Sequence, residues 1–213
     1  MKIQKLIVGL GNPGHNYVRT RHNAGFLLLD LLVERFDAKP SRDHSDYLLW
    51  TAEHAACRLF LMKPLTYMNL SGRALISFLS EVPIDLDCIL VAYDDVALPL
   101  GTIRVKPSGS AGGQKGMKHI IETLESRELP RLRIGIGTED TATYPLVDWV
   151  LGNFEENELP LIANALDRAA DACLGWLEAD VESLMARFNS KTPLSAETKT
   201  QIPGFPYMEE KIE

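Results

Sequence analysis

The sequence predicts an α/β fold, with a single domain, a mixed and mostly parallel twisted sheet, and helices on both faces of that sheet. Short apolar runs rich in Val, Ile and Leu alternate with segments in which apolar residues recur every three or four positions. The first pattern is typical of buried strands and the second of helices, so their alternation favours a sheet covered on both sides. With 213 residues and 46% hydrophobic content, the chain is long enough to bury one sizeable core.

The expected elements follow in chain order. Strands are predicted where a short apolar run stands between turn residues, at 5–10, 47–52, 58–62, 88–93, 101–106 and 131–137. Helices are predicted where the helical spacing is sustained, at 25–36, 70–79, 116–124, 156–177 and 181–188. We therefore expect one domain over residues 1–189. Residues 190–213 mix polar side chains with prolines, and we expect this tail to be disordered.

Charge is unevenly distributed along the chain. A formal net charge of −7 argues against a protein that coats nucleic acid over its whole surface. Residues 101–133 nevertheless carry seven basic side chains against three acidic ones, and residues 134–180 carry ten acidic against one basic. Two interpretations stand side by side. The segments form ordinary solvated faces, or the first forms a cationic platform that holds phosphates.

Three cysteines, Cys57, Cys88 and Cys173, have no metal-binding or redox spacing. This favours free thiols and a cytoplasmic location. The apolar runs are too short for a transmembrane helix, so no membrane association is expected. The five histidines show no metal-ligand spacing with Cys or carboxylates, and we expect neither a metal nor a cofactor.

The glycines at positions 9, 11 and 14 satisfy the letters of a dinucleotide-binding fingerprint. That fingerprint also needs a helix opening at the glycines and an acidic residue about 20 positions later at a strand end. Residues 15–21 lack an apolar stripe, and the next acidic residue, Asp30, lies inside the helix expected at 25–36. A nicotinamide-dependent oxidoreductase is therefore kept only as an alternative, which a cofactor titration would test.

Polar side chains follow several of the predicted strands. Asn12, Asn69 and Asp94 come at or just after the ends of three of them, and ligands dock outside the carboxyl ends of strands in such sheets. Asn69 is either a ligand-binding amide or the N-cap of the helix that follows. Asp94 either orients an imidazole or forms a turn. His22, close to the glycine-rich segment, is either a structural histidine or, with amides nearby, an imidazole that moves a proton at an active site.

A glycine-dense loop at 108–116 leads into a predicted helix, and its exposed backbone N–H groups suit a phosphate or an oxyanion. It lacks the spacing of a nucleoside triphosphatase loop, because no Ser or Thr follows Lys115. Arg131 and Arg133 alternate on the strand at 131–137, where they are either phosphate ligands or surface residues that extend into solvent.

Taken together, these motifs closely resemble the bacterial-type peptidyl-tRNA hydrolase family. The resemblance runs in order from about Lys5 to Phe188. The segments that carry it are Gly9-Leu10-Gly11-Asn12-Pro13-Gly14, Tyr17, Thr20-Arg21-His22-Asn23-Ala24-Gly25, Lys63-Pro64 with Met68-Asn69-Leu70-Ser71-Gly72, Asp94 with Pro99 and Gly101, Gly112-Gly113 with Gly116, and Arg131-Leu132-Arg133-Ile134-Gly135-Ile136-Gly137.

The resemblance implies a monomeric cytosolic esterase that cleaves peptidyl-tRNA at the 3′ ribose, recognises its acceptor stem and 3′ end, and needs no cofactor. It implies that His22 is the catalytic base and Asp94 the acid that orients it. The implied substrate-binding residues are Asn12, Tyr17, Met68, Asn69, Gly112, Gln114 and Lys115, and the implied tRNA phosphate ligands are Lys106 and Arg133.

One departure from the family pattern affects the site. The family usually has His-Asn where this chain has Gln114-Lys115. An amide replaces an imidazole and a point charge replaces an amide, which changes the donors available for a reacting carbonyl. This leaves a non-catalytic RNA-binding relative as the second alternative.

Overall fold

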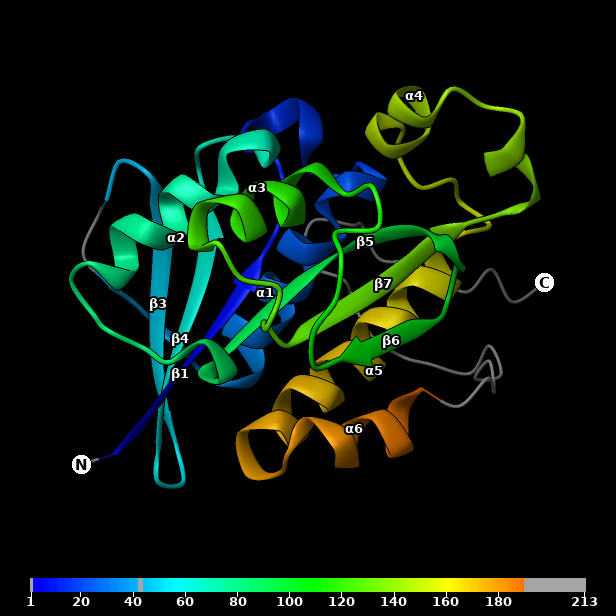
Figure 1. The fold of residues 1–213 in the computed structure, drawn as a ribbon. Helices are drawn as coiled ribbons and strands as arrows, with labels where there is room; N and C mark the ends of the chain where they lie inside the picture. The colour runs from blue at the N-terminus through cyan, green and yellow to red at the C-terminus, as the bar shows by residue number, and fades with distance from the viewer. Residues whose placement is uncertain (1, 42–43, 190–213) are drawn as a thin grey trace.

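The computed structural model describes residues 2–41 and 44–189. In this part of the chain seven strands form one sheet in the order β2-β3-β4-β1-β5-β7-β6 (Figure 1). The strands are β1 Ile3–Gly9, β2 Lys39–Pro40, β3 Tyr47–His54, β4 Cys57–Pro64, β5 Ile89–Pro99, β6 Ile103–Lys106 and β7 Arg131–Gly137. The central strands β4, β1, β5 and β7 run parallel, and the outer pairs are antiparallel. The predicted mixed sheet is confirmed.

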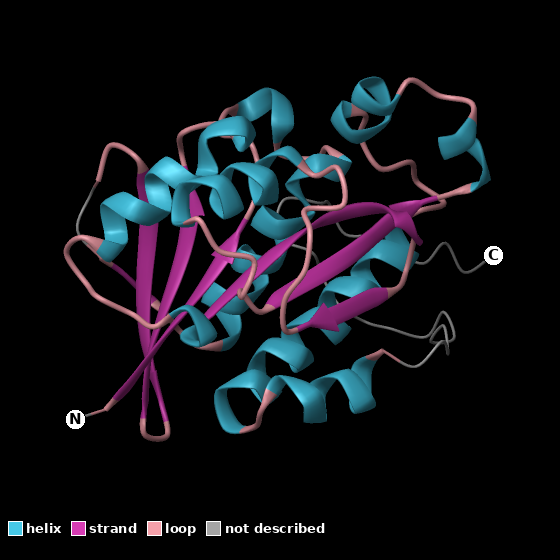
Figure 2. Cartoon of the chain, viewed as in Figure 1, coloured by secondary structure: helices cyan, strands magenta, loops and turns pink. Residues whose placement is uncertain are grey.

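Helices cover both faces of this sheet (Figure 2). Helices α1 (Ala24–Arg35), α5 (Leu159–Glu178) and α6 (Val181–Phe188) pack into one core with residues such as Ile7 and Leu61. Helices α2 (Ser71–Leu79) and α3 (Lys115–Leu124) pack into a second core with residues such as Val8 and Met62. Because successive side chains of a strand point to opposite faces, one short apolar run contributes to both cores.

Glycines bring the start of α1 into close contact with the central strands. A Cβ on Gly9 would lie 2.3 Å from the carbonyl oxygen of Gly25, and one on Gly25 would lie 2.5 Å from that of Ala92. No side chain fits at either position. These glycines therefore fix the segment that immediately precedes α1, which carries His22, against the ends of β1 and β5.

Lys63 joins β4 to α1 from a nearly buried position. Its ammonium group pairs with the Asp30 carboxylate and lies 5.1 Å from the centroid of the Phe26 ring. Burial lowers the pKa of Lys63, while the Asp30 carboxylate opposes that shift. The lysine of the Lys63-Pro64 motif thus lies at a junction between a strand and a helix.

The main differences from the sequence predictions concern three elements. Strand β5 continues to Pro99, six residues past the predicted end, with an irregular register between Asp95 and Pro99. The short helix α4 (Leu146–Leu151) and the two-residue strand β2 were not predicted. The expected disordered tail at 190–213 lies outside the described residues.

No helix in the described ranges is both long and apolar enough to cross a membrane.

Candidate active site

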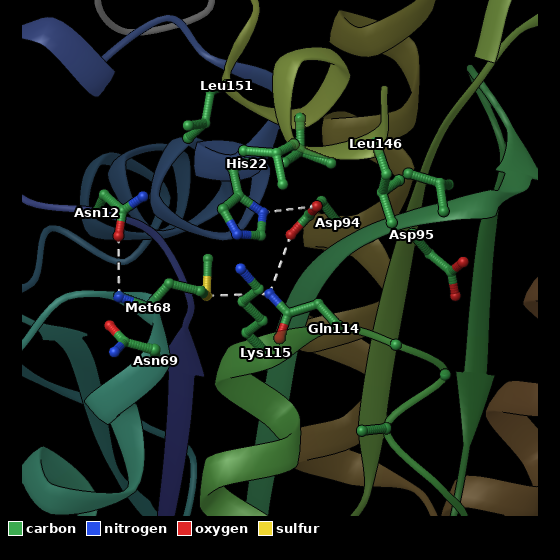
Figure 3. A pocket seen from close by; sticks show the side chains of 16 residues that line it. Asn12, His22, Met68, Asn69, Asp94, Asp95, Gln114, Lys115, Leu146 and Leu151 are labelled. Carbon is green, nitrogen blue, oxygen red and sulfur yellow. Dashed lines mark hydrogen bonds and ion pairs between the residues drawn. The ribbon is translucent and has the colours of Figure 1, made fainter. Parts of the chain in front are cut away.

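A cavity of about 280 Å³ opens at the carboxyl ends of β1, β4 and β5, where the sequence placed Asn12, Asn69 and Asp94 (Figure 3). One wall comes from the loop that leads into α3 and another from α4. The residues that line it are Asn12, His22, Met68, Asn69, Asp94, Asp95, Val96, Ala111, Gly112, Gly113, Gln114, Lys115, Leu146, Val147, Val150 and Leu151.

His22 and Asp94 meet at this cavity. The distance from His22 Nδ1 to Asp94 Oδ2 is 2.8 Å, and the two residues are 8% and 2% exposed. A carboxylate accepts hydrogen bonds but donates none, so neutral His22 carries its hydrogen on Nδ1 and its lone pair on Nε2. An imidazole in this tautomer can accept a proton at Nε2 from a molecule bound in the cavity.

The Asn12 side chain supports the opposite wall. Its Oδ1 accepts a hydrogen bond of 2.8 Å from the backbone N–H of Met68. Asn69 lies in the short 3-10 helix Met68–Leu70, with an exposed side chain that also lines the cavity. The N-cap position of α2 is Leu70, which makes no side-chain capping hydrogen bond, so of the two alternatives for Asn69 the N-cap was wrong.

The glycine-dense loop reaches the cavity through Gly112, Gly113, Gln114 and Lys115. Gly112 and Gly113 have φ of 60° and 89°, a left-handed conformation that glycine adopts without strain. Gln114 is the N-cap of α3, and its side chain accepts a hydrogen bond from the Met117 N–H. The start of α3, where the helix dipole favours negative charge, therefore lies at the cavity.

Arg131 anchors this loop from beneath. It is 1% exposed, and its guanidinium donates to the carbonyl oxygens of Gly109, Ser110, Arg127 and Leu129. Both interpretations made from the sequence, a phosphate ligand or an exposed surface side chain, are wrong for Arg131. Its alternation with Arg133 could not reveal that backbone carbonyls of the glycine-dense loop and of the segment before β7 would together accept hydrogen bonds from all three guanidinium nitrogens.

The remaining predicted residues lie outside the cavity. Tyr17 is half-buried in the 3-10 helix His15–Tyr17 and is not among the lining residues. Lys106 is exposed on β6 and Arg133 is half-buried on β7. Register pairs Lys106 with Arg131 and Arg104 with Arg133, so these four cations share one face of the sheet. Arg133 also forms an ion pair with Asp95, which does line the cavity.

Sequence reasoning missed helix α4. It contributes Leu146, Val147, Val150 and Leu151 to the cavity, and Trp149 is its one buried residue. The available signal was the pairing of apolar residues at 146–147 and again at 150–151, which repeats after four positions. These side chains make one end of the cavity apolar.

Within the part of the chain that the structure describes, neither a cluster of metal-ligating side chains nor the complete dinucleotide-binding fingerprint is found. No three His, Cys, Asp or Glu residues in the described ranges gather closely enough to hold a metal ion. After Gly14 the chain forms two 3-10 turns before α1 begins at Ala24, so no helix opens at the glycines as the dinucleotide fingerprint requires.

Comparison with known proteins adds to this geometry. A family model described as peptidyl-tRNA hydrolase matches residues 6–197. The peptidyl-tRNA hydrolase of Syntrophomonas wolfei is 42% identical over 185 residues, covering 87% of this chain and 100% of that protein. That of Bacillus subtilis is 40% identical over 186 residues, covering 87% and 98%. A crystal structure of peptidyl-tRNA hydrolase from Acinetobacter baumannii matches with a TM-score of 0.81 and 32% identity, covering 91% of this chain and 98% of that one. This chain belongs to the peptidyl-tRNA hydrolase family.

Proposed function

We propose that this chain hydrolyses the ester bond between a peptide and the 3′ ribose of tRNA, with His22 as the general base. The observation that carries the proposal is the 2.8 Å contact between His22 Nδ1 and Asp94 in a cavity that also holds the amides of Asn12 and Asn69. Of the described residues that line the cavity, none is Ser, Thr or Cys, which favours water as the nucleophile.

The reaction proceeds in two steps. His22 Nε2 takes a proton from a water molecule as the water oxygen bonds to the ester carbonyl carbon, and the carbonyl oxygen becomes an oxyanion. When the carbonyl re-forms, the bond from carbon to the ribose 3′ oxygen breaks and the imidazolium gives its proton to that oxygen. The products are a peptide with a free carboxyl group and a tRNA with a free 3′ hydroxyl group.

This machinery is sufficient for an ester. General-base assistance contributes roughly 10²- to 10⁴-fold in rate, and one oxyanion donor roughly 10²- to 10³-fold. We assign donation toward the substrate to the amides of Asn12 and Asn69 and to the loop at Gly112, and we assign contact with the 3′ end and the peptide to Met68 and Tyr17. The apolar side chains of α4 suit the side chains of a peptide.

Lys115 replaces the amide that the family usually has at the start of α3. Its exposed side chain lines the cavity, so we propose that its charge stabilises the oxyanion or a nearby phosphate. A single-turnover comparison with Lys115→Asn tests this role, because the amide keeps a donor but loses the charge. If the charge acts on the oxyanion, the variant is slower at saturating substrate, and if it acts on a phosphate, KM rises instead.

The cationic face of β6 and β7 is the proposed site for the acceptor stem. Lys106 and Arg133 would hold a tRNA phosphate there, in agreement with the basic segment at 101–133. We further propose that residues 1–189 act as one catalytic domain, that the protein works as a cytoplasmic monomer, and that no stable protein partner is required.

The decisive experiment compares wild type and His22→Ala on a lysyl-tRNA whose amino groups are acetylated. We expect wild type to hydrolyse it and His22→Ala to lose turnover while tRNA binding stays nearly intact. His15→Ala is the matched control, because His15 is exposed and lies outside the cavity. Near wild-type hydrolysis by His22→Ala would show that another group is the base.

The same assay separates the proposal from its first alternative, and a cofactor titration separates it from the second. A non-catalytic RNA-binding relative would bind the tRNA without releasing the blocked lysine. A nicotinamide oxidoreductase would bind a nicotinamide dinucleotide in a titration, and the lack of an α-helix directly after Gly14 argues against that alternative. Membership of the peptidyl-tRNA hydrolase family and the retained contact of His22 with Asp94 both support catalysis.

A further inference from the structure

We propose that Gln114 is a positioning residue, which holds Asp94 in the orientation that His22 needs. The inference rests on the proposed hydrolysis, because it concerns how the same base is kept in place. It starts from three buried side chains in a row, since Gln114 and His22 are each 8% exposed and Asp94 is 2% exposed (Figure 3).

The orientation of the Gln114 amide is fixed by helix α3. Its Oε1 accepts a hydrogen bond of 2.7 Å from the backbone N–H of Met117. The opposite orientation of the amide would turn two donors toward each other, so the NH₂ group must face away from the helix. It faces Asp94, and the distance from Gln114 Nε2 to Asp94 Oδ1 is 3.1 Å.

Asp94 is thereby held at both carboxylate oxygens. Oδ1 accepts from Gln114 at 3.1 Å and Oδ2 accepts from His22 Nδ1 at 2.8 Å. With both oxygens engaged, the carboxylate plane cannot rotate without breaking one of the two bonds. Since the His22 tautomer depends on the hydrogen bond that its Nδ1 makes, the orientation of Asp94 decides where the lone pair of His22 lies.

The other hydrogen of the Gln114 amide is also engaged. Nε2 lies 3.0 Å from Met68 Sδ, and the Met68 N–H in turn donates to Asn12. The Gln114 amide therefore contacts the first turn of α3, Asp94 and Met68. Each of its hydrogen-bonding groups has a partner within the protein. A direct contact between Gln114 and substrate stays a prediction, whereas its contact with Asp94 is present in the structure.

Gln114→Glu separates positioning from a merely structural role. A glutamate keeps the size of the side chain and the acceptor that caps α3, and a carboxylate is favoured at a helix N-terminus. It removes the donor that faces Asp94 and places a second carboxylate there. We expect kcat to fall about 10²-fold, the loss typical of a misplaced catalytic group, with KM within about twofold. Because the second buried carboxylate also lowers the melting temperature, Gln114→Ser, which adds no charge, is the variant expected to keep a melting temperature close to wild type. Gln114→Ser, which also caps the helix but is too short to reach Asp94, should lose kcat in the same direction.

The second measurement is ¹⁵N NMR of the His22 imidazole in the resting protein, which needs no substrate. We expect the Nδ1-protonated tautomer in wild type and a mixture of tautomers in Gln114→Ser. If wild type itself fails to hydrolyse the blocked lysyl-tRNA but the tautomer changes as expected, the proposed function fails and the positioning stands. If wild type is active and both variants keep its kcat and its tautomer, the positioning role is refuted.

Discussion

Asn23 holds both backbone polar groups of Asn12 with one side chain. Its Oδ1 accepts from the Asn12 N–H at 2.8 Å, and its Nδ2 donates to the Asn12 carbonyl oxygen at 3.1 Å. Asn23 directly follows His22, and the side chain of Asn12 carries the hydrogen bond to Met68. The hydrogen bonds between Asn23 and Asn12 therefore connect the segment that carries His22 to the loop after β1. The hydrogen bond between Asn12 and Met68 connects that loop to the segment after β4.

Asn23→Ala should lower both stability and turnover. The substitution leaves two buried backbone groups without their partner. Each unsatisfied buried group lowers the free energy of unfolding by about 1 to 3 kcal/mol. Because Asn12 then loses its fixed position, kcat should fall as well. Urea unfolding gives the free energy of unfolding, and single-turnover hydrolysis gives the rate.

Asn189→Ala is the matched control for this prediction. Asn189 holds the N–H and carbonyl of Val105 on the edge strand β6 in the same bidentate way, at 2.8 and 2.9 Å. It should lose stability without a change in kcat. If Asn23→Ala and Asn189→Ala behave alike in turnover, the coupling between Asn23 and the site is not functional.

Arg133→Ala should raise KM for the tRNA substrate and make KM less dependent on salt. Removing one cation that contacts a phosphate reduces the number of counterions released on binding, so the slope of log KM against log salt becomes flatter. Asp95→Asn should change the slope in the opposite direction, because it removes the charge of the carboxylate that pairs with Arg133. Arg58→Ala, an exposed arginine on β4, is the control and should leave the slope unchanged. An unaltered slope in Arg133→Ala would exclude this arginine from the phosphate site.

Much of the fold could be predicted because the core strands are short runs of Val, Ile and Leu and the helices keep a clear period. The extension of β5 could not. Asp94, Asp95 and Pro99 are poor strand residues, and their pairing with β7 overrides that local preference. Helix α4 was missed because its six residues bury a single side chain, so no long apolar stripe exists.

The candidate active site could be predicted only in part. That Asp94 faces His22 followed from the resemblance to a family and from the rule on strand ends, and the distance agrees with it. The partners of Gln114 and Arg131 could not be foreseen, because each depends on which loop lies over which strand. A sequence shows that an amide or a guanidinium is present, but only the fold shows whether its donors face the cavity or the protein itself.

Tyr67 should store backbone strain beside the cavity. Its φ of 58° and ψ of 158° are a combination that glycine adopts and other residues avoid, and its side chain is exposed. Tyr67→Gly and Tyr67→Ala both remove the ring, but only glycine relieves the strain. We expect the glycine variant to be more stable than the alanine variant by about 1 kcal/mol in chemical unfolding. The Gly variant should also have the lower kcat, since the neighbouring Met68-Asn69 segment gains freedom. Equal stability of the two variants would mean that the backbone carries no strain here.

Arg21 and Glu158 form a buried ion pair that joins the segment of His22 to the region between α4 and α5. The distance from Arg21 Nη2 to Glu158 Oε2 is 2.7 Å, and the two side chains are 5% and 9% exposed. The guanidinium also lies 4.0 Å from the centroid of the Trp149 ring, on the helix that lines the cavity. Glu158 in turn accepts a hydrogen bond from the Glu155 N–H. This cluster therefore connects the proposed base with the apolar wall.

Arg21→Met should lower the free energy of unfolding by about 3 to 5 kcal/mol, because it leaves the Glu158 carboxylate buried without its partner. Glu158→Gln should cost less than Arg21→Met, since the glutamine keeps an acceptor for the Glu155 N–H, although it leaves Arg21 unpaired. The double variant removes both charges, so its loss in the free energy of unfolding should be smaller than the sum of the two single losses. A double-mutant cycle with urea unfolding measures this difference. Because the apolar wall then loses its connection to the His22 segment, the double variant should recover stability without recovering KM for peptidyl-tRNA. Recovery of both would show that the pair contributes to folding alone.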